Sequence, residues 1–175
     1  MNDAPETIQT ILQRQSCRYF LSDELPEKHL KLLLECMRWA PSAGNMQPWR
    51  FYVVRDDERK QGLVASAYGQ RFIADAPVVM VVCAVADESA ARYSERGATL
   101  YCIQDTAAAV QNLLLAATAL GYGTCWIGAF DEQAAAEALK LPRRERPVAI
   151  IPVGKPSRMG SRTNRRPVDE VVIQD

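Results

Sequence analysis

The 175-residue sequence contains a single histidine and no pair of cysteines in a CxxC pattern. His29 stands among charged residues, which predicts a surface position and leaves no histidine for a catalytic triad or a histidine-rich metal site. The five cysteines are an odd number, and Cys36, Cys83 and Cys102 lie in apolar runs. These three are therefore predicted to be buried thiols, and neither disulfides nor a metal site are expected.

Long apolar runs and a net charge are also lacking. No apolar run approaches the ~20 residues that a membrane-spanning helix needs. Residues 1–6 are acidic and contain no apolar segment of the kind found in signal peptides, so a cytoplasmic location is the default expectation. Lys+Arg and Asp+Glu both number 21, which gives a formal net charge of zero. This balance gives no reason to expect nucleic acid or a membrane as a partner.

The composition that remains is that of a globular protein, with 48% hydrophobic and 24% charged residues. Residues 1–175 show no repeat, no low-complexity tract and no linker, so one domain is expected. The neutral total conceals a basic segment at 142–166, where eight basic residues stand against Glu145 alone. This segment either attracts a phosphate or another anion, or forms a solvated basic tail.

Spacing and cap residues predict helices over residues 5–14, 26–39, 56–68, 99–119 and 131–139. Alternating or continuous apolar runs predict strands over residues 49–55, 77–85 and 147–154. Helices and strands do not alternate strictly, which favours an α+β fold over a doubly wound sheet. Beyond residue 155 the chain is polar until a last apolar patch, formed by Val168, Val171, Val172 and Ile173. This patch either returns to its own sheet or reaches a partner subunit.

The connection between the second helix and the first strand, residues 41–48, is rich in hydrogen-bonding groups. Two prolines bracket it and restrict the backbone, and Ser42, Asn45 and Gln47 lie between them. Such a stiff loop suits the binding of a planar polar ligand, such as a flavin or a nucleobase. It equally fits an ordinary turn followed by a core residue, Trp49.

A second candidate site follows the first helix. In an extended chain Ser16 and Arg18 point to the same side, and Arg14 joins them from the last helical turn. Two guanidinium groups and a hydroxyl suit a phosphate. The alternative is an arginine pair that solvates a helix end.

Six motifs that span nearly the whole chain together resemble the nitroreductase family of FMN-dependent oxidoreductases. They are Arg14-x-Ser16-x-Arg18-x-Phe20, Ala40-Pro41-Ser42-Ala43-Gly44-Asn45-x-Gln47-Pro48-Trp49-x-Phe51, Ala76-Pro77, Leu120-Gly121-Tyr122-Gly123-Thr124-Cys125-Trp126-Ile127-Gly128, Pro152-Val153-Gly154-Lys155-Pro156 and Arg165-Arg166-Pro167-Val168-Asp169-Glu170-Val171-Val172. The resemblance implies a nitroreductase-like fold with a central mixed or antiparallel sheet flanked by helices. It also implies an intertwined homodimer that exchanges its C-terminal arms and holds FMN at the interface.

The resemblance further implies the residues that bind FMN. The phosphate and ribityl chain would meet Arg14, Gln15, Ser16 and Arg18, with Gln15 at a position that is often basic in the family, and either Arg165 or Arg166 would complete the clamp. The partner subunit would contribute Pro41, Ser42, Ala43 and Asn45 to the isoalloxazine ring, and Trp126, Ile127 and Gly128 would lie on the ring's other side. Gln70 or Arg71 would reach the pyrimidine edge, where a positive charge favours the reduced, anionic flavin.

No catalytic side chain is expected, because the flavin carries the chemistry. The resemblance implies a ping-pong reaction in which NAD(P)H passes hydride to flavin N5 and an electron-poor nitroaromatic or quinone then takes the electrons. The chain is short for the family, and segments that often build a lid or a helical excursion over the flavin are not evident. Alternatives are a dehalogenating, dehydrogenating or flavin-fragmenting branch, and a flavin-binding module without turnover. The physiological acceptor, the choice between NADH and NADPH, and the reactivity of Cys17 and Cys125 stay open.

Overall fold

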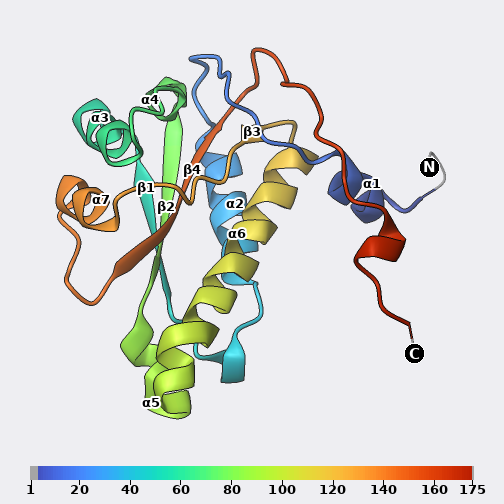
Figure 1. Cartoon of the computed structure of the whole chain (residues 1–175). Coiled ribbons are helices and arrows are strands. Elements are labelled where there is room, and N and C mark those ends of the chain that lie inside the picture. Colours follow the sequence, from blue (N-terminus) through green and yellow to red (C-terminus); the bar gives the residue numbers. More distant parts are fainter. Residues whose placement is uncertain (1–3, 175) are drawn as a thin grey trace.

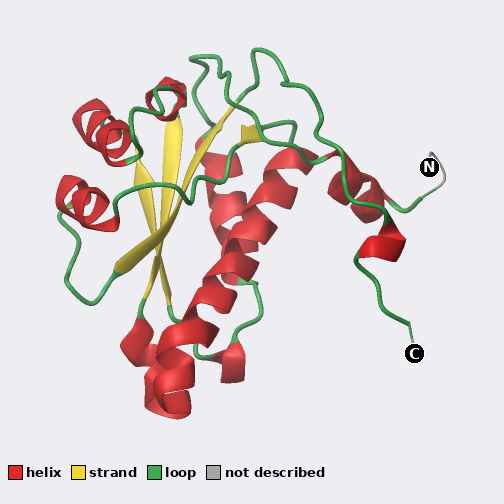
Figure 2. Cartoon of the chain, viewed as in Figure 1, coloured by secondary structure: helices red, strands yellow, loops and turns green. Residues whose placement is uncertain are grey.

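The computed structural model describes residues 4–174 (Figure 1, Figure 2). The α-helices are α1 (Glu6–Gln13), α2 (Glu27–Arg38), α3 (Asp57–Ser66), α4 (Phe72–Asp75), α5 (Ala86–Arg96), α6 (Cys102–Ala119) and α7 (Glu132–Leu139). The strands are β1 (Trp49–Val54), β2 (Val78–Ala84), β3 (Gly123–Thr124) and β4 (Arg146–Gly154). Two short 3₁₀ turns, η1 (Ala43–Asn45) and η3 (Val168–Glu170), and one π-helical turn, η2 (Gly97–Tyr101), complete the elements.

The sheet has the strand order β1-β2-β4-β3, and neighbouring strands pair antiparallel. Helices α3, α4 and α7 lie on one face, and α2 and α6 lie on the other (Figure 1). The α+β prediction is therefore confirmed, with the central sheet in its antiparallel form.

Strand β2 lies at the centre of both cores, as its continuous apolar run predicts. All seven of its residues are buried. Val78, Met80 and Val82 pack in the cluster with α2 and α6, whereas Val79 and Val81 pack in the cluster with α3 and α7. The alternation of side chains along a strand makes this division, so one strand supports two hydrophobic layers.

Leu113 tests the first of these layers, since it lies on α6 with no exposed surface. Replacing it by alanine is expected to lower the free energy of unfolding by ~2–5 kcal/mol, because the deletion leaves a cavity in a packed core. Urea denaturation measures the loss. Gln133→Ala, on the exposed side of α7, is the matched control and is expected to change stability by less than about 0.5 kcal/mol. Equal losses in both variants would contradict the assignment of this core.

The structure departs from the predicted elements in the middle of the chain. The sequence patterns predict neither α4 nor α5. The first is a single turn, and the second buries only Ser89, so neither shows an apolar stripe. Helix α6 begins at Cys102 rather than residue 99, because residues 97–101 form η2. A short helical excursion, α5 with η2, is thus present between β2 and α6, where the sequence patterns showed none.

His29 also departs from its prediction, because it is not a plain surface residue. It is half-buried, and its Nδ1 lies 2.7 Å from the hydroxyl of Tyr122. The two rings meet edge to face with centroids 5.7 Å apart. His29 thereby connects the start of α2 to the segment before β3, a structural role.

Helix α1 lies beside α6, to one side of the sheet, and the C-terminal segment extends past it (Figure 1). Helix α1 has no buried residue, although Ile8, Ile11 and Leu12 share one face. The apolar patch of the C-terminal segment is exposed as well, and Ile173 is 95% exposed. The patch does not return to its own sheet within the described residues, which removes one of the two alternatives.

Candidate functional site

A cavity of about 520 Å³ lies where the chain leaves α1. Its lining residues are Arg14, Gln15, Ser16, Arg18, Tyr19, Gly160, Ser161, Arg162, Thr163 and Arg165. The segment after α1 is extended because Ser16 bridges Thr124 of β3 and the Cys17 N–H donates to the Thr124 carbonyl at 2.8 Å. Cys17 is buried while Ser16 and Arg18 are exposed. The predicted convergence of Arg14, Ser16 and Arg18 on one side is confirmed.

All the charged side chains that line this cavity are positive. Four guanidinium groups line it, from Arg14, Arg18, Arg162 and Arg165, and no carboxylate is among the lining residues. Arg166 points elsewhere, since its Nε donates to Glu170 at 3.1 Å. Of the two late arginines, the structure therefore brings Arg165 to the cavity.

Several lining residues are absent from the sequence predictions, namely Tyr19, Gly160, Ser161, Arg162 and Thr163. They belong to no motif that could be matched. The excess of positive charge over residues 142–166 was the available signal for Arg162. It indicated an anion site without saying which arginine of the segment would face it.

The residues predicted to reach the flavin ring from the same subunit as the cavity gather at the cavity's end of the sheet. The Arg18 guanidinium lies over the Phe72 ring, 5.9 Å from its centroid, at the start of α4. The Gln70 amide nitrogen donates to the Ala129 carbonyl at 3.3 Å, beside the segment 126–128. In that segment Trp126 is 41% exposed and Gly128 is exposed, but Ile127 is buried and pairs with Ile150 of β4. The Ile127 N–H donates to the Ile150 carbonyl at 3.0 Å, and the Ile127 carbonyl accepts the Ile150 N–H at 3.1 Å. Of the three predicted residues, the exposed Trp126 and Gly128 are therefore in a position to face a ligand, and Ile127 is not.

The two candidates for the pyrimidine edge differ in their hydrogen bonding. Gln70 donates to the carbonyl groups of Ala67 and Ala129. Arg71 is exposed, and within residues 4–174 its guanidinium forms no hydrogen bond or ion pair. A free guanidinium is the group that can approach a charged ring, so Arg71 is the stronger candidate.

The loop at 41–48 lies at the opposite end of the sheet. Trp49 pairs with Ala84, the last residue of β2, whereas Thr124 pairs with Val153, which pairs with Val78, the first residue of β2. Six strand steps of about 3.3 Å separate these ends by roughly 20 Å. Figure 1 shows the loop with η1 near α5, far from the segment that follows α1. One chain thus does not bring Pro41, Ser42, Ala43 and Asn45 to the arginine cavity.

The loop itself is rigid. Gly44, Asn45 and Gln47 have φ values of 55°, 58° and 51°, in the left-handed region. The Ser42 hydroxyl accepts a hydrogen bond from the Gln47 N–H at 3.0 Å. The simple packing role predicted as the alternative for Trp49 is confirmed, since the indole is 6% exposed and lies in the core.

Asp105 of α6 forms a hydrogen bond to the loop at 41–48. Its Oδ1 accepts the Ala43 N–H at 3.0 Å, and its Oδ2 is buried without a hydrogen-bond partner in the described part of the chain. Burial raises the pKa of Asp105, and the hydrogen bond from Ala43 opposes that rise. The sequence patterns did not single out this residue, because a lone acid near the start of a helix is common.

A pH dependence follows from this raised pKa. The folded protein keeps the Asp105 proton to higher pH than the unfolded chain does, so ionisation costs stability as pH rises through this range. Asp105→Asn keeps the acceptor for Ala43 and cannot ionise. The variant is expected to be more stable than the wild type at pH 7 and to lose less stability between pH 4 and pH 7. Urea denaturation at both pH values measures this, and an unchanged slope would contradict it.

The two cysteines near the cavity are buried: Cys17 has no exposed surface, and Cys125 is 3% exposed. Burial raises the pKa of the Cys125 thiol, although Arg18 and a hydrogen bond with Ser16 act in the opposite direction. The Cys17 thiol donates to the Tyr19 carbonyl at 3.2 Å. Both thiols are buried, whereas a reactive thiolate needs exposure to solvent.

Cys36, Cys83 and Cys102 are also free thiols. Cys83 and Cys102 are buried as predicted, and Cys36 is half-buried. Within residues 4–174 no group of three histidine, cysteine or acidic side chains is arranged to hold a metal ion. Among the same residues, no helix is long and apolar enough to cross a membrane.

Comparison with known proteins decides the family. The model of the nitroreductase family matches residues 11–69 and 59–155. The chain belongs to the nitroreductase family. A protein of Thermus thermophilus named NADH dehydrogenase is 32% identical over 93% of this chain and 92% of its own length. A Bacillus subtilis protein named FMN reductase [NAD(P)H] is 27% identical over 97% of this chain and 74% of its own length.

Solved structures agree with this assignment. The crystal structure of a nitroreductase family protein from Streptococcus pneumoniae matches with a TM-score of 0.87 at 26% identity, covering 97% of this chain and 100% of that one. The nitroreductase-like fold implied by the sequence is thus confirmed, and the family supports an oxidoreductase.

Proposed function

We propose that this nitroreductase family member is an FMN-dependent oxidoreductase that takes electrons from NAD(P)H and passes them to an electron-poor acceptor, such as a quinone or a nitroaromatic. The observation that carries the proposal is the cavity lined by four arginines and no carboxylate, where Ser16 bridges Thr124. A phosphate dianion fits such a donor set, because guanidinium binds phosphate through paired charged hydrogen bonds. The name of the Bacillus subtilis relative supports FMN and NAD(P)H as the cofactor and the donor.

The proposed roles follow from where the side chains lie. Arg14, Arg18 and Arg165 hold the phosphate, with Gln15 and Ser16 as neutral donors. Arg162, which also lines the cavity, adds a fourth positive charge. The exposed Trp126 and Gly128 face the ring, and Ile127 holds them in place through its bonds to Ile150. Arg71, rather than Gln70, meets the pyrimidine edge.

A second copy of the chain completes the proposed site. The loop with Pro41, Ser42, Ala43 and Asn45 lies at the end of the sheet opposite the cavity in one chain, and these ends are roughly 20 Å apart, about the length of β2. Helix α1 and the C-terminal patch expose apolar surface that a partner would cover. A homodimer with exchanged C-terminal arms accounts for both features, since it brings the loop of one subunit to the cavity of the other.

The protein itself binds the cofactor, orients it and limits the access of substrates to it. When bound, FMN supplies the redox chemistry, accepting hydride from NAD(P)H at N5 and giving up the electrons to the second substrate in a ping-pong sequence. The arginine cavity anchors one end of the cofactor, and the rigid loop at 41–48 limits which face a substrate reaches. No side chain is required to act as a general acid or base.

Arg71 provides a test of how the protein adjusts the cofactor. A cation at the pyrimidine edge stabilises the anionic reduced flavin, so Arg71→Ala is expected to lower the flavin midpoint potential. Spectroelectrochemical titration measures the potential. Arg59→Ala, which removes an exposed arginine of α3, is the control and is expected to leave the midpoint potential unchanged. An unchanged potential in Arg71→Ala would remove this residue from the site.

The function is tested by adding NADH or NADPH without oxygen to protein reconstituted with FMN. The expected result is a flavin absorption spectrum that bleaches and returns when a quinone is added. Protein that shows no flavin spectrum after reconstitution would overturn the proposal. A yellow protein that neither nucleotide bleaches would instead indicate a flavin-binding module without turnover.

A further inference from the structure

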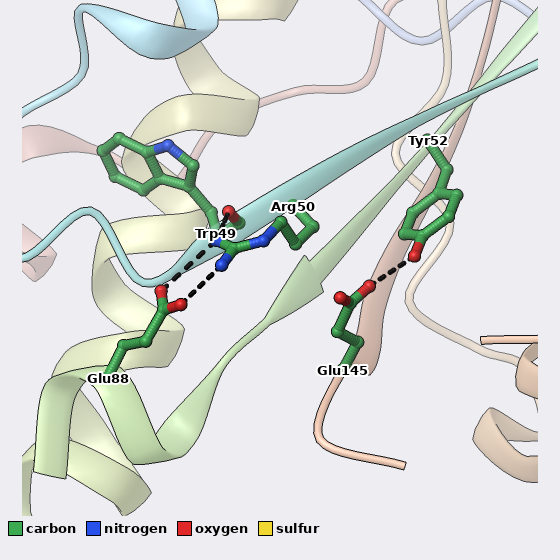
Figure 3. Close-up of polar contacts among 5 residues, drawn as sticks. All are labelled: Trp49, Arg50, Tyr52, Glu88 and Glu145. Carbon is green, nitrogen blue, oxygen red and sulfur yellow. Dashed lines mark hydrogen bonds and ion pairs between the residues drawn. The ribbon is translucent and has the colours of Figure 1, made fainter. Parts of the chain in front are cut away.

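The excursion formed by α5 and η2 is fixed to the loop at 41–48. The Val85 N–H donates to the Pro48 carbonyl at 2.9 Å, just before α5 begins. Arg50 of β1 forms an ion pair with Glu88 of α5, and its Nη1 lies 3.2 Å from Glu88 Oε2 (Figure 3). In the same view, Tyr52 of β1 donates to the buried Glu145 before β4. The first two of these contacts join the start of α5 to the loop and to β1, and the third joins β1 to the segment before β4.

At its other end α5 lies against the loop itself. The Arg92 Nη1 lies 3.4 Å from the Gly44 carbonyl oxygen. A Cβ atom at position 44 would overlap the Tyr93 hydroxyl and lie 3.0 Å from Arg92 Nη1. Gly44 therefore lets a phenol and a guanidinium approach the loop that the proposed function brings to the flavin of the second copy.

Tyr93 is held in place by its own neighbours. Its ring meets Tyr101 of η2 edge to face, with centroids 5.2 Å apart. Arg96 fixes Tyr101 through an Nε bond of 2.9 Å to its hydroxyl. Ser94, the next residue along, has φ 50° and ψ −139°, a conformation that costs energy in a residue other than glycine. The backbone is thus strained at the residue directly after Tyr93.

The hydroxyl of Tyr93 has no hydrogen-bond partner within residues 4–174, although the side chain is only half-exposed. Arg92 is exposed and forms no ion pair among these residues. Two donors, one neutral and one charged, are thus available beside the loop. A planar aromatic ring with an oxygen that gains negative charge would match them.

We propose that Tyr93 and Arg92 form the subsite for the oxygen of the electron acceptor, and that they favour planar aromatic acceptors with a carbonyl or nitro oxygen. The inference rests on the proposed function and specifies the substrate class of that site. Donors aimed at the atom where charge develops stabilise the transition state more than the ground state. Tyr101 and Arg96 are positioning residues, because they act on the acceptor only through Tyr93.

The reaction balances without a proton from the protein. A quinone that receives a hydride, supplied ultimately by NAD(P)H, and one proton from solvent becomes a hydroquinone. The Tyr93 hydroxyl donates a hydrogen bond to the carbonyl oxygen during this step and keeps its own proton. Arg92 contributes charge and a second hydrogen bond.

The first test measures the oxidative half-reaction separately. FMN-loaded protein is reduced with dithionite without oxygen and mixed with 1,4-benzoquinone, so that NAD(P)H is not needed. Tyr93→Phe keeps the ring and removes the hydroxyl, and is expected to slow flavin reoxidation about tenfold, the effect of one lost hydrogen bond of about 1.4 kcal/mol. Tyr101→Phe removes a hydroxyl from the same cluster without removing a proposed donor, and is expected to slow it less than about threefold. Equal rates in wild type and Tyr93→Phe would overturn the proposal.

The second test measures the binding of an acceptor rather than the rate of the reaction. Calorimetric titration of the oxidised protein with 4-nitrobenzoate is expected to show a dissociation constant about tenfold higher in Arg92→Gln than in the wild type. Arg59→Gln removes an exposed arginine on α3 and is the matched control, with an unchanged constant. No binding to the wild type, or the same constant in Arg92→Gln, would overturn the subsite. Failure of NADH and NADPH to reduce the flavin would count against the proposed function alone.

Discussion

Replacing Arg18 by alanine is expected to raise the dissociation constant of FMN roughly ten- to hundredfold, because charged hydrogen bonds to the phosphate are worth about 1.5–3 kcal/mol. Arg18 lines the cavity and lies over the ring of Phe72, so its loss removes charge from a preorganised position. Quenching of flavin fluorescence during titration of the apoprotein measures the constant.

Riboflavin provides the internal control for this prediction, since it has the same ring but no phosphate. Its affinity is expected to be nearly the same in Arg18→Ala and the wild type. Arg59→Ala is expected to change neither constant. If Arg18→Ala weakened riboflavin as strongly as FMN, the cavity would not be the phosphate site.

Removing residues 161–175 is expected to leave a folded protein that no longer dimerises and binds FMN at least a hundredfold more weakly. The segment described by the structure, to residue 174, contains no buried residue, so the two cores do not depend on it. It does provide Arg162 and Arg165 to the cavity and the exposed apolar patch to the proposed partner. Light scattering reports the mass, circular dichroism the fold, and flavin titration the affinity.

A second variant separates the two contributions of this segment. This variant keeps Arg162 and Arg165 and removes the apolar patch. It has serine at all four apolar positions, Val168, Val171, Val172 and Ile173. It is expected to weaken the dimer while the arginine cavity of each subunit stays intact. A truncated protein that remained a dimer with full FMN affinity would contradict the arm exchange and the role of Arg165 together.

Much of the fold was predictable from local patterns. The apolar run of β2 predicted a strand covered on both faces. The spacing of Leu30, Leu33, Leu34 and Met37 predicted the apolar face of α2, and all four are buried except Leu34, which is half-buried. Asp56 and Asp131 were predicted as N-caps, and each side chain accepts a backbone N–H three residues later. These features depend on neighbours in sequence, so they can be recognised without the fold.

Other features could not be predicted because they depend on distant contacts. Helix α5 is mostly polar and shows no core-facing stripe, so its place against Gly44 is visible only in three dimensions. The bond from Ala43 to Asp105 joins residues 62 positions apart. His29 showed only its charged neighbours in sequence, whereas Tyr122, its partner, lies 93 residues away.

The sequence by itself determined the family, through six motifs in order, and the convergence of Arg14, Ser16 and Arg18, through the alternation of an extended chain. Only the tertiary structure decided that Arg165 rather than Arg166 reaches the cavity, and that the loop at 41–48 lies at the other end of the sheet. The physical reason is that a motif records which groups are present over a few residues. Which of those groups share a site depends on how the strands pair, because strand pairing places segments that are far apart in the chain at the same end of the sheet or at opposite ends.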